Sequence, residues 1–584
     1  MKNNLPCHRL LALLAALLTT RMAHAQAPTW QAATAFANNV ALMATVADAS
    51  GNIYLAGSFT GVANFGSYAL TSAGGSDIFV AKWSPASGSY TWAKRAGSTA
   101  DEVASAVAVS GNSLYVAGYF TGATAPFGSY TLANASSNGT ADIFVAKLAD
   151  VGSSADFTWA QQAGGTGAES PTAMAVSGSN VYLTGKYQSP VLVLGGSTLA
   201  NAGNLPNGEL FVAKLTDAGT AGSFVWGQRV GANTNGTPLA PDFCFYPALA
   251  VSGSNVYIAG FFQGAATFGA TVLSNAGGTS TYQNLFVAKL ADAGSSASFV
   301  WAQQNASTGG AHAYAIAVNG PAVYVGGAFY SSTVSFGGIS LTNSNSSPFG
   351  ISDDAYVAKL TDAGSSSSFT WVQHMGGVSD DAVAALVSQG SDIYVAGQSN
   401  SHVGTYANTT LTNASSTINR EIFAAKLTDF GAFPDVAWAQ QGGGPGDEYA
   451  AALAVSGGSV SVSGTFNLSA SFGNYALAGP ATTRNYFLAT LGATPLATEA
   501  KTAAMVLDLF PNPAHGCATI QLPATPGTAT ATLTILDALG RTLRTQMAAT
   551  NTKADLDLTG LAPGLYAVRV AAGGSTTTQK LVVE

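Results

Sequence analysis

Charged residues are scarce in this chain, at 9% of its 584 residues. A protein with so few Lys, Arg, Asp and Glu cannot cover its surface with ion pairs, and Gly, Ala, Ser, Thr and Asn take their place. Its outer face must therefore be built from hydroxyl and amide groups, which favours an extracellular all-β protein. The net charge of −8 also argues against nucleic-acid binding, because phosphate contacts need many Lys and Arg side chains.

Cysteine is nearly absent: Cys7, Cys244 and Cys517 are the only three. Cys7 lies in the leader described below, and the other two fall in different predicted domains without a paired spacing. We therefore expect no disulfide framework and two isolated, packed thiols. Long apolar runs are absent as well, since no segment of the mature chain approaches the ~20 residues of a membrane-spanning helix.

Residues 1–25 have the pattern of a secretory signal peptide. Lys2 and Arg9 form a basic start, Leu10–Leu18 is a short apolar core, and an A-x-A site at 23–25 precedes Gln26. The sequence thus predicts export of a soluble chain. Cleavage would remove three basic residues and leave the mature chain more acidic.

Tryptophans recur at intervals of 62 to 75 residues, and a fixed period indicates repeat architecture. The seven positions are Trp30, Trp92, Trp159, Trp226, Trp301, Trp371 and Trp438. Two further patterns also occur seven times each. Segments like GNIYLAG lie at 51–57, 112–118, 180–185, 255–260, 322–327, 392–397 and 459–464, and segments like IFVAKL lie at 78–83, 143–148, 210–215, 285–290, 355–360, 422–427 and 486–491.

Each repeat is interpreted as four short antiparallel strands. An Ala-rich alternating strand and the GNIYLAG-like strand are joined by a Gly-containing hairpin turn, and the IFVAKL-like and Trp-containing strands follow. Four such strands repeated radially predict a seven-bladed β-propeller over residues 26–491. Six Trp segments end a repeat, while Thr29-Trp30-Gln31 precedes the first one. The N-terminal strand is therefore predicted to pair with 486–491 and to close the ring.

Packing roles follow from this arrangement. Small Ala side chains suit the inner strands near the axis, and Tyr115, Phe144, Phe211 and Phe286 are expected to fill the wider gaps between blades. The repeated Trp residues are interpreted as part of the same packing, since an aromatic side chain buries about 150–250 Å².

The repeat resembles a bacterial β-propeller repeat family described as seven-bladed. Its units have an acidic, Gly-rich lead-in, an alternating strand and then G-N-V-Y-V-x-G. The match is clear in blades two to six and weaker in the seventh, where Ser461 replaces the Tyr. The resemblance implies a scaffold and does not imply one activity.

The last eighty residues leave this register. Residues 492–506 are predicted to be a linker and 507–584 a small Ig-like β-sandwich. The motifs F-P-N-P, I-x-D-x-x-G-R, L-x-x-G-x-Y-x-V and a final K-L-V resemble the type A C-terminal sorting domain of the type IX secretion system of Bacteroidota. The matching residues are Pro511, Asn512, Pro513, Gly540, Arg541, Gly564, Tyr566 and Lys580. The resemblance implies contact with that secretion machinery and a secreted or surface-anchored product; an ordinary carbohydrate-binding or Ig-like module is the alternative.

Acidic residues gather in the loops that lead into the innermost strands. They are Asp101, Glu102, Glu169, Asp242, Asp380, Asp381, Asp447 and Glu448, with His312 in place of the acid in blade five. A ring of carboxylates at the channel mouth could hold Ca²⁺ or supply an acid–base pair for glycoside chemistry. The alternative is that each acid caps a turn and bonds backbone N–H groups of the neighbouring blade.

The opposite face carries a D-x-G turn nine residues before a Trp in five repeats, at Asp150, Asp217, Asp292, Asp362 and Asp429. These turns are interpreted as structural. Arg95 and Arg229 occupy equivalent strand positions, which does not favour the convergent arginines of a sialidase. No nucleophile elbow, zinc motif, phosphate-binding loop or Cys/His cluster is present.

Three functions remain open on these grounds. The first is a non-catalytic surface protein, expected to be monomeric, that binds a glycan or protein ligand through its loop-rich face. The second is a glycoside hydrolase or lyase that uses the acidic ring, and the third is a structural or adhesive surface protein. No cofactor is certain, and Ca²⁺ is the one candidate.

Overall fold

The structure is a computed structural model. It describes residues 27–201, 208–230, 247–275, 283–306, 310–345, 352–407, 409–413, 419–480, 484–492, 508–522, 529–537, 542–572 and 575–584. The predicted signal peptide, residues 493–506 of the predicted linker, Asp242, Cys244, Gly540 and Arg541 lie outside these ranges.

The described residues form strands and contain no helix, so the all-β prediction is confirmed. The chain divides into two compact units, Met1–Ala493 and Thr494–Glu584. No helix that could cross a membrane occurs among the residues that the structure describes.

In the first unit, seven sheets follow one plan of four antiparallel strands, in chain order except that β1 supplies the fourth strand of the last sheet. We number them I to VII from the N-terminus. The first strands are β2 (Val40–Ala47), β8 (Glu102–Ser110), β14 (Glu169–Ser177), β20 (Ala248–Ser252), β26 (Ala311–Asn319), β32 (Asp381–Gln389) and β38 (Glu448–Ser456). The second strands are β3 (Ile53–Phe59), β9 (Ser113–Phe120), β15 (Asn180–Tyr187), β21 (Asn255–Gln263), β27 (Ala322–Phe329), β33 (Asp392–Ser399) and β39 (Ser459–Phe466).

The outer two strands of each sheet complete the plan. The third strands are β6 (Asp77–Ser84), β12 (Asp142–Asp150), β18 (Glu209–Asp217), β24 (Gln283–Asp292), β30 (Asp354–Asp362), β36 (Glu421–Asp429) and β42 (Asn485–Gly492). The fourth strands are β7 (Ser89–Ala96), β13 (Ala155–Ala163), β19 (Gly222–Val230), β25 (Ala297–Gln304), β31 (Ser367–Gly377), β37 (Pro434–Gly442) and, in sheet VII, β1 (Thr29–Ala35).

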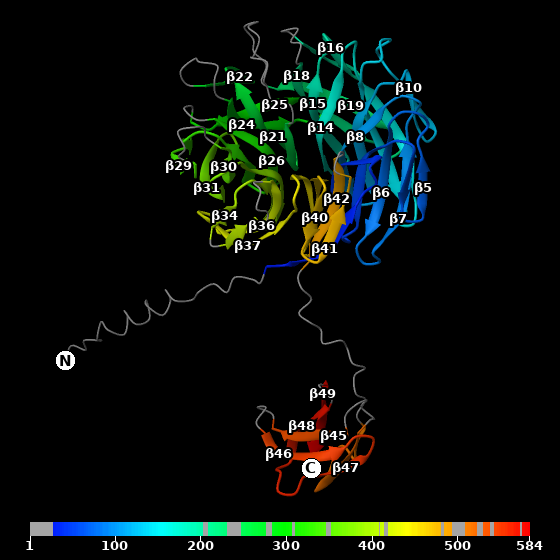
Figure 1. Cartoon of the computed structure of the whole chain (residues 1–584), viewed down its shortest axis with the longest axis vertical. Helices are drawn as coiled ribbons and strands as arrows, with labels where there is room; N and C mark the ends of the chain where they lie inside the picture. The colour runs from blue at the N-terminus through cyan, green and yellow to red at the C-terminus, as the bar shows by residue number, and fades with distance from the viewer. Residues whose placement is uncertain are drawn as a thin grey trace, which may run out of the picture. The chain divides into compact units, whose positions relative to one another are not determined.

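The first strands contact one another in a closed cycle. Each touches the first strand of the next sheet, and β38 of sheet VII touches β2 of sheet I. In Figure 1 the orange strands that end the unit accordingly lie beside the blue strands that begin it. The small side chains of these strands permit this close approach; Ala104, Ala106 and Ala315, for example, are buried in the clusters between sheets.

Strand β1 pairs antiparallel with β42, as the sequence predicts, but Trp30 does not occupy the position of the other tryptophans. Trp30 faces Leu491, as Phe157 faces Leu148, and Ala32 stands where Trp159 stands in sheet II. Trp30 packs edge-on against Phe472, with ring centroids 5.0 Å apart, and its Nε1 donates to the backbone oxygen of Gln441 at 2.9 Å. The interpretation of Trp30 as the seventh equivalent Trp is therefore wrong by two residues.

A short hairpin lies between the second and third strands of each sheet, where the sequence analysis placed no strand. The hairpins are β4–β5 (Val62–Phe65, Tyr68–Thr71), β10–β11 (Thr124–Phe127, Tyr130–Ala133), β16–β17 (Val191–Leu194, Ser197–Ala200), β22–β23 (Ala265–Phe268, Thr271–Ser274), β28–β29 (Thr333–Phe336, Ile339–Thr342), β34–β35 (Val403–Tyr406, Thr409–Thr412) and β40–β41 (Ser469–Phe472, Tyr475–Ala478). Phe127 of one hairpin packs against Phe144 in a tilted arrangement, with ring centroids 4.7 Å apart, and meets Phe157 edge-on at 5.7 Å.

These hairpins also contact the preceding sheet. The N–H of Gly97 at the end of sheet I donates to Pro126 of the next hairpin, and β31 pairs with β34 to extend sheet V to six strands. The hairpins thus cover fourth strands that would otherwise present open edges.

The second unit contains two sheets of its own, in the orders β43-β44-β47 and β46-β45-β48-β49. Their strands are β43 (Asp508–Phe510), β44 (Cys517–Gln521), β45 (Thr530–Leu536), β46 (Thr542–Ala549), β47 (Lys553–Asp557), β48 (Gly564–Ala572) and β49 (Ser575–Val583). Ile520, Leu533, Val568 and Leu581 are buried between them. Cys517 is exposed, so the prediction that its thiol is packed is wrong, because it begins β44 on the outward side of the strand.

Residues of the sorting motif have structural roles in this unit. The side chain of Asn512 joins the last strand: its Nδ2 donates to Lys580 O at 2.7 Å and its Oδ1 accepts from Val582 N at 2.8 Å. Tyr566 OH donates to Ala562 O at 2.8 Å beside Gly564, the first residue of β48. Pro511 and Pro513 flank Asn512 in the segment that leads to this contact.

Candidate functional site

Four of the predicted acids begin the first strands of their sheets and are almost completely buried. Glu102, Glu169, Asp381 and Glu448 are 0–1% exposed. Glu102 accepts hydrogen bonds from Ser98 N at 2.8 Å and Ser98 Oγ at 2.6 Å, and Glu448 accepts from Gly444 N at 3.0 Å. Their carboxylates therefore hold the turn that enters the strand and do not face solvent.

At three of these positions the preceding residue is also an acid, and it bonds to the preceding sheet. Asp101 accepts from Ser76 N at 2.9 Å, and Asp447 accepts from Arg420 N at 3.0 Å. Asp380 likewise accepts from the backbone N–H of Asp353 at 3.2 Å. Each acceptor binds the residue that begins, or immediately precedes, a third strand, so these acids link neighbouring sheets.

His312 is not the counterpart of the buried acids. Ala311 faces Phe329 in sheet V as Glu102 faces Phe120 in sheet II, so His312 lies one residue further along the strand. Its ring hydrogen-bonds with Tyr314 OH and Gln283 Oε1, each at 2.7 Å. Burial lowers the pKa of His312 to about 4, so the ring is neutral near pH 7.

A second set of buried acids begins the third strands and was missed by the sequence analysis. Its members are Asp77, Asp142, Glu209, Asp354 and Glu421. The signal was available, because each residue directly precedes an IFVAKL-like segment. Arg95 pairs with Asp77, and Arg229 binds both oxygens of Glu209 at 2.6 and 2.9 Å. Both arginines are thus occupied within their own sheets.

The two sets of acids meet between neighbouring sheets. A Cβ built on Gly97 would lie 2.5 Å from Glu102 Oε2 and 2.9 Å from Asp77 Cγ. A Cβ built on Gly443 would lie 2.4 Å from Glu421 Cγ and 2.9 Å from Glu448 Oε2. These glycines thus leave room for two carboxyl groups that face each other.

At two contacts, both positions of the pair carry neutral residues. Asn284 takes the third-strand position in sheet IV and Ala311 the first-strand position in sheet V. Asn485 and Val40 stand at the corresponding positions of sheets VII and I. This pattern indicates that the two carboxyl groups function as a unit. A buried carboxylate is costly unless it is hydrogen-bonded or protonated.

Burial raises the pKa of these first-strand acids. The pKa of Glu448 rises to about 8, through desolvation above all and through the charge of Glu421. Desolvation likewise raises the pKa of Glu169 to about 7, and those of Glu102 and Asp381 to about 6, although each accepts hydrogen bonds that favour the charged form. Near neutral pH such a pair can share a proton.

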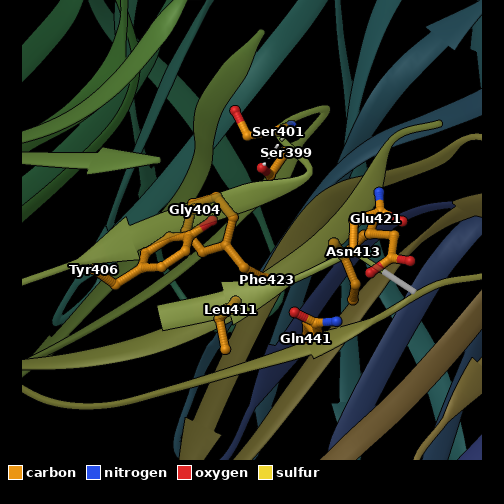
Figure 2. A pocket seen from close by; sticks show the side chains of 10 residues that line it. Ser399, Ser401, Gly404, Tyr406, Leu411, Asn413, Glu421, Phe423 and Gln441 are labelled. Atoms are coloured by element: carbon orange, nitrogen blue, oxygen red, sulfur yellow. Dashed lines mark hydrogen bonds between the residues drawn. The ribbon is translucent and has the colours of Figure 1, made fainter. Parts of the chain in front are cut away.

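Figure 2 shows the surroundings of one third-strand acid, Glu421. Its carboxylate lies near the amide of Gln441, while Tyr406 of the β34–β35 hairpin lies on the far side of the pocket. Gln441 donates to Thr412 O at 2.5 Å, which ties the fourth strand to that hairpin. Within the described ranges, no group of three or more His, Cys, Asp or Glu side chains is placed to hold a metal ion.

We expect the first unit to lose stability as the pH rises from 5 to 8. The folded state holds protons on Glu169 and Glu448 that the unfolded chain releases near pH 4.5, so the free energy of unfolding falls as pH rises through their folded pKa values of about 7 and 8. Thermal unfolding of the wild type and of Glu448→Gln across this range tests the point. The variant should show a smaller decline, and a wild-type Tm that increases toward pH 8 would contradict the prediction.

The opposite face carries a constellation that recurs at five contacts between sheets. Asp292 at the end of β24 accepts from Lys214 Nζ at 2.6 Å, Tyr182 OH at 2.7 Å, Trp226 Nε1 at 3.0 Å and Gly294 N at 2.9 Å. The Tyr, Lys and Trp belong to the preceding sheet. The other four acceptors are Asp150, Asp217, Asp362 and Asp429.

These aspartates remain charged because their partners outweigh burial. Desolvation by itself would raise the pKa of Asp292, but the bonds from Lys214, Tyr182, Gly294 and Trp226 hold that pKa below its ordinary value. The interpretation of the D-x-G turns and of six tryptophans as packing elements agrees with these contacts. Five of them, Trp92, Trp159, Trp226, Trp301 and Trp371, bond the Asp of the next repeat and not one that stands nine residues before them.

One cluster at the first face departs from the repeat. The Arg420 guanidinium lies 5.1 Å from the ring centroid of Tyr449, and that of Arg484 lies 5.8 Å from it. Arg420 also donates to Tyr449 OH at 2.5 Å and lies 3.5 Å from Asp380. Arg484 is exposed and makes no ion pair among the described residues. Ser76 and Ala141 stand at the equivalent positions of sheets I and II.

Comparison with known proteins identifies the second unit. Residues 508–584 match the family model described as "Secretion system C-terminal sorting domain". This domain indicates export through the type IX secretion system to the cell surface or the extracellular space. A search of the curated proteins finds no match.

Similarity to solved structures is weak. The Trypanosoma rangeli sialidase aligns at 11% identity with a TM-score of 0.28, covering 95% of this chain and 84% of the sialidase. The same sialidase in complex with 2,3-difluorosialic acid aligns at 11% identity with a TM-score of 0.29, covering 95% of this chain and 89% of the sialidase. Dimeric latent PorU from Porphyromonas gingivalis aligns at 13% identity with a TM-score of 0.12, covering 69% of this chain and 31% of PorU. With every TM-score below 0.5, these likenesses bear on neither the fold nor the function.

Proposed function

We propose that the first unit is a seven-bladed β-propeller, closed by its N-terminal strand, that serves as a non-catalytic binding scaffold at the cell surface or in the extracellular space. The cyclic contacts of the first strands and the pairing of β1 with β42 support the closed ring. Residues 1–25 are proposed to be removed as a signal peptide, and 507–584 to act as the sorting domain behind a linker. We propose that the propeller functions as a monomer.

One observation carries the non-catalytic assignment: the acids of the first face are buried and recur. A glycosidase needs two carboxyl groups that reach one substrate, at a separation of about 5–9.5 Å. Here the pairs lie close together, but their first-strand members are 0–1% exposed, and the same arrangement occurs between several sheets. Repetition and burial favour a role in joining sheets, with the loops left to carry recognition.

A glycoside hydrolase remains the second candidate because burial raises the pKa of Glu169 to about 7 and of Glu448 to about 8, the range of a general acid. It would require these carboxyl groups to become accessible. Among the residues of the first face that are accessible in the structure, Tyr449 and Arg484 are the best candidates for ligand contact, since a guanidinium and a stacked phenol can bind glycan or protein groups.

The two functions separate in one experiment. We expect the secreted protein to bind a component of a glycan array or an extracellular protein library, and Arg484→Ala with Tyr449→Ala to weaken that binding at least tenfold without a change in Tm. Lys94→Ala, on the outer part of sheet I, is the matched surface control. Hydrolysis of any tested glycoside that Glu169→Gln abolishes would refute the non-catalytic assignment.

A further inference from the structure

The contact between sheets VII and I lacks all four members of the recurring constellation. Ser461 and Thr490 replace the Tyr and the Lys, as their mutual pairing in the register shows. Ala32 stands at the Trp position and Pro85 at the Asp position. Four large or charged side chains are thus exchanged for four small ones at the place where the chain closes on itself.

The missing side-chain volume leaves a pocket. It measures about 290 Å³, and both Ser461 and Pro85 line it. Most of its other polar groups are hydroxyls and an amide, from Ser50, Asn52 and Ser456 among others. Ser461 Oγ and Thr490 Oγ1 are 3.0 Å apart, in place of the Tyr and Lys that elsewhere reach an Asp.

A larger pocket of about 570 Å³ lies on the other side of the same turn. The two pockets share Ala49, Ser50 and Asn52 of the turn between β2 and β3. The larger one adds the carboxylate of Asp48, which no other sheet has at this position, and the exposed Asn112 of sheet II. The two pockets therefore flank one turn across sheets VII, I and II.

The lining specifies the ligand chemistry. The serine hydroxyls and the exposed amide of Asn112 pair with the alternating donors and acceptors of sugar hydroxyls. The carboxylate of Asp48 holds the turn itself, since its oxygens accept from the N–H groups of Ser50 and Asn52, from Asn52 Nδ2 and from Tyr54 OH. The cation in the lining, Lys82, is already bonded to Asp150 at 2.6 Å, so no basic side chain of the lining is free for an anionic group. The combined volume falls in the range of small-ligand sites, roughly 300–1,000 Å³.

We propose that this double pocket is a binding site for a neutral, hydroxyl-rich oligosaccharide, on the face opposite to Tyr449 and Arg484. The smaller pocket follows from ring closure, because Ser461 and Pro85 line it in place of the Tyr and the Asp found at other contacts. The larger pocket lies beside the complete constellation of Tyr54, Lys82 and Asp150 at the next contact. The double pocket is independent of the first-face site and can hold a ligand whether or not that site does.

Isothermal titration of the secreted protein with neutral linear hexasaccharides of glucose, mannose and xylose tests the proposal. We expect at least one to bind, and Ser50→Trp to weaken that binding at least tenfold, because the exposed Ser50 side chain stands between the pockets. Ser179→Trp, on the corresponding turn of sheet III, should bind as the wild type does. Both variants alter exposed turn residues, and matching Tm values will show that they fold.

A second variant fills the pocket from within. Ser461→Tyr with Pro85→Asp restores two members of the constellation and should also abolish saccharide binding. Failure of every neutral hexasaccharide to bind the wild type would overturn the proposal, as would binding that Ser50→Trp leaves unchanged. Binding that is lost in Arg484→Ala but kept in Ser50→Trp would assign the saccharide to the first face and would also overturn it.

Discussion

Asp292→Ala is expected to destabilise the first unit by about 3–5 kcal/mol, because it leaves Lys214 charged and unpaired in the contact between sheets III and IV. The side chains of Lys214 and Asp292 are 5% and 3% exposed, and the aspartate also accepts from Tyr182 and Trp226. One substitution thus removes the shared acceptor of three side chains. Urea unfolding monitored by tryptophan fluorescence measures the loss.

The matched control is an exposed ion pair in the same unit. Lys94 and Asp156 are 2.9 Å apart, with side chains 33% and 82% exposed. Asp156→Ala should therefore change the free energy of unfolding by less than about 1 kcal/mol. Equal effects of Asp292→Ala and Asp156→Ala would show that the buried constellation adds no stability beyond that of a surface pair.

Deletion of residues 26–37 is expected to have the second large effect, because it removes β1 and opens sheet VII. The Trp30 side chain, 7% exposed, would be lost from the cluster that contains Phe472 and Leu491, at a cost of about 3–5 kcal/mol for the aromatic alone. The edge of β42 would become unpaired, and an open edge promotes association. Size-exclusion chromatography and thermal unfolding should reveal a less stable, self-associating protein.

Two controls define the origin of that effect. A chain that ends at residue 493 retains the whole first unit and should unfold at the wild-type temperature of that unit. A synthetic peptide of residues 26–37, added in trans, should restore part of the lost stability to the truncated chain. If the truncated chain remains monomeric with an unchanged Tm, the pairing of β1 with β42 does not stabilise the first unit.

Much of the architecture could be predicted from the sequence because it is repeated. The alternation of apolar residues, the Gly-containing turns and the IFVAKL-like segments each recur seven times, so an error in one copy is corrected by the others. The strands, the pairing of 29–35 with 485–492 and the sorting domain follow from such patterns. The small hairpins were missed because four-residue strands give little periodic signal.

The sequence analysis placed two residues wrongly because it inferred their strand positions from residue type alone. Trp30 completes the series of tryptophans by identity, yet the register places it with Phe157 and puts Ala32 at the Trp position. His312 was likewise placed with the acids, although Ala311 holds that position. Strand pairing decides equivalence through backbone hydrogen bonds, and a shift of one residue moves a side chain to the other side of the sheet.

The main strands, the turns, the repeat length and the C-terminal sorting domain could be predicted because they depend on residues near one another in the chain. Which side chains meet depends on how the sheets pack, and this is seen only in the folded protein. Trp159 stands nine residues after Asp150, but it bonds Asp217, because neighbouring repeats are packed sheet against sheet. For the same reason the acids became buried pairs, and Pro85 and Ser461, from distant parts of the chain, came together to line the pocket where the ring closes.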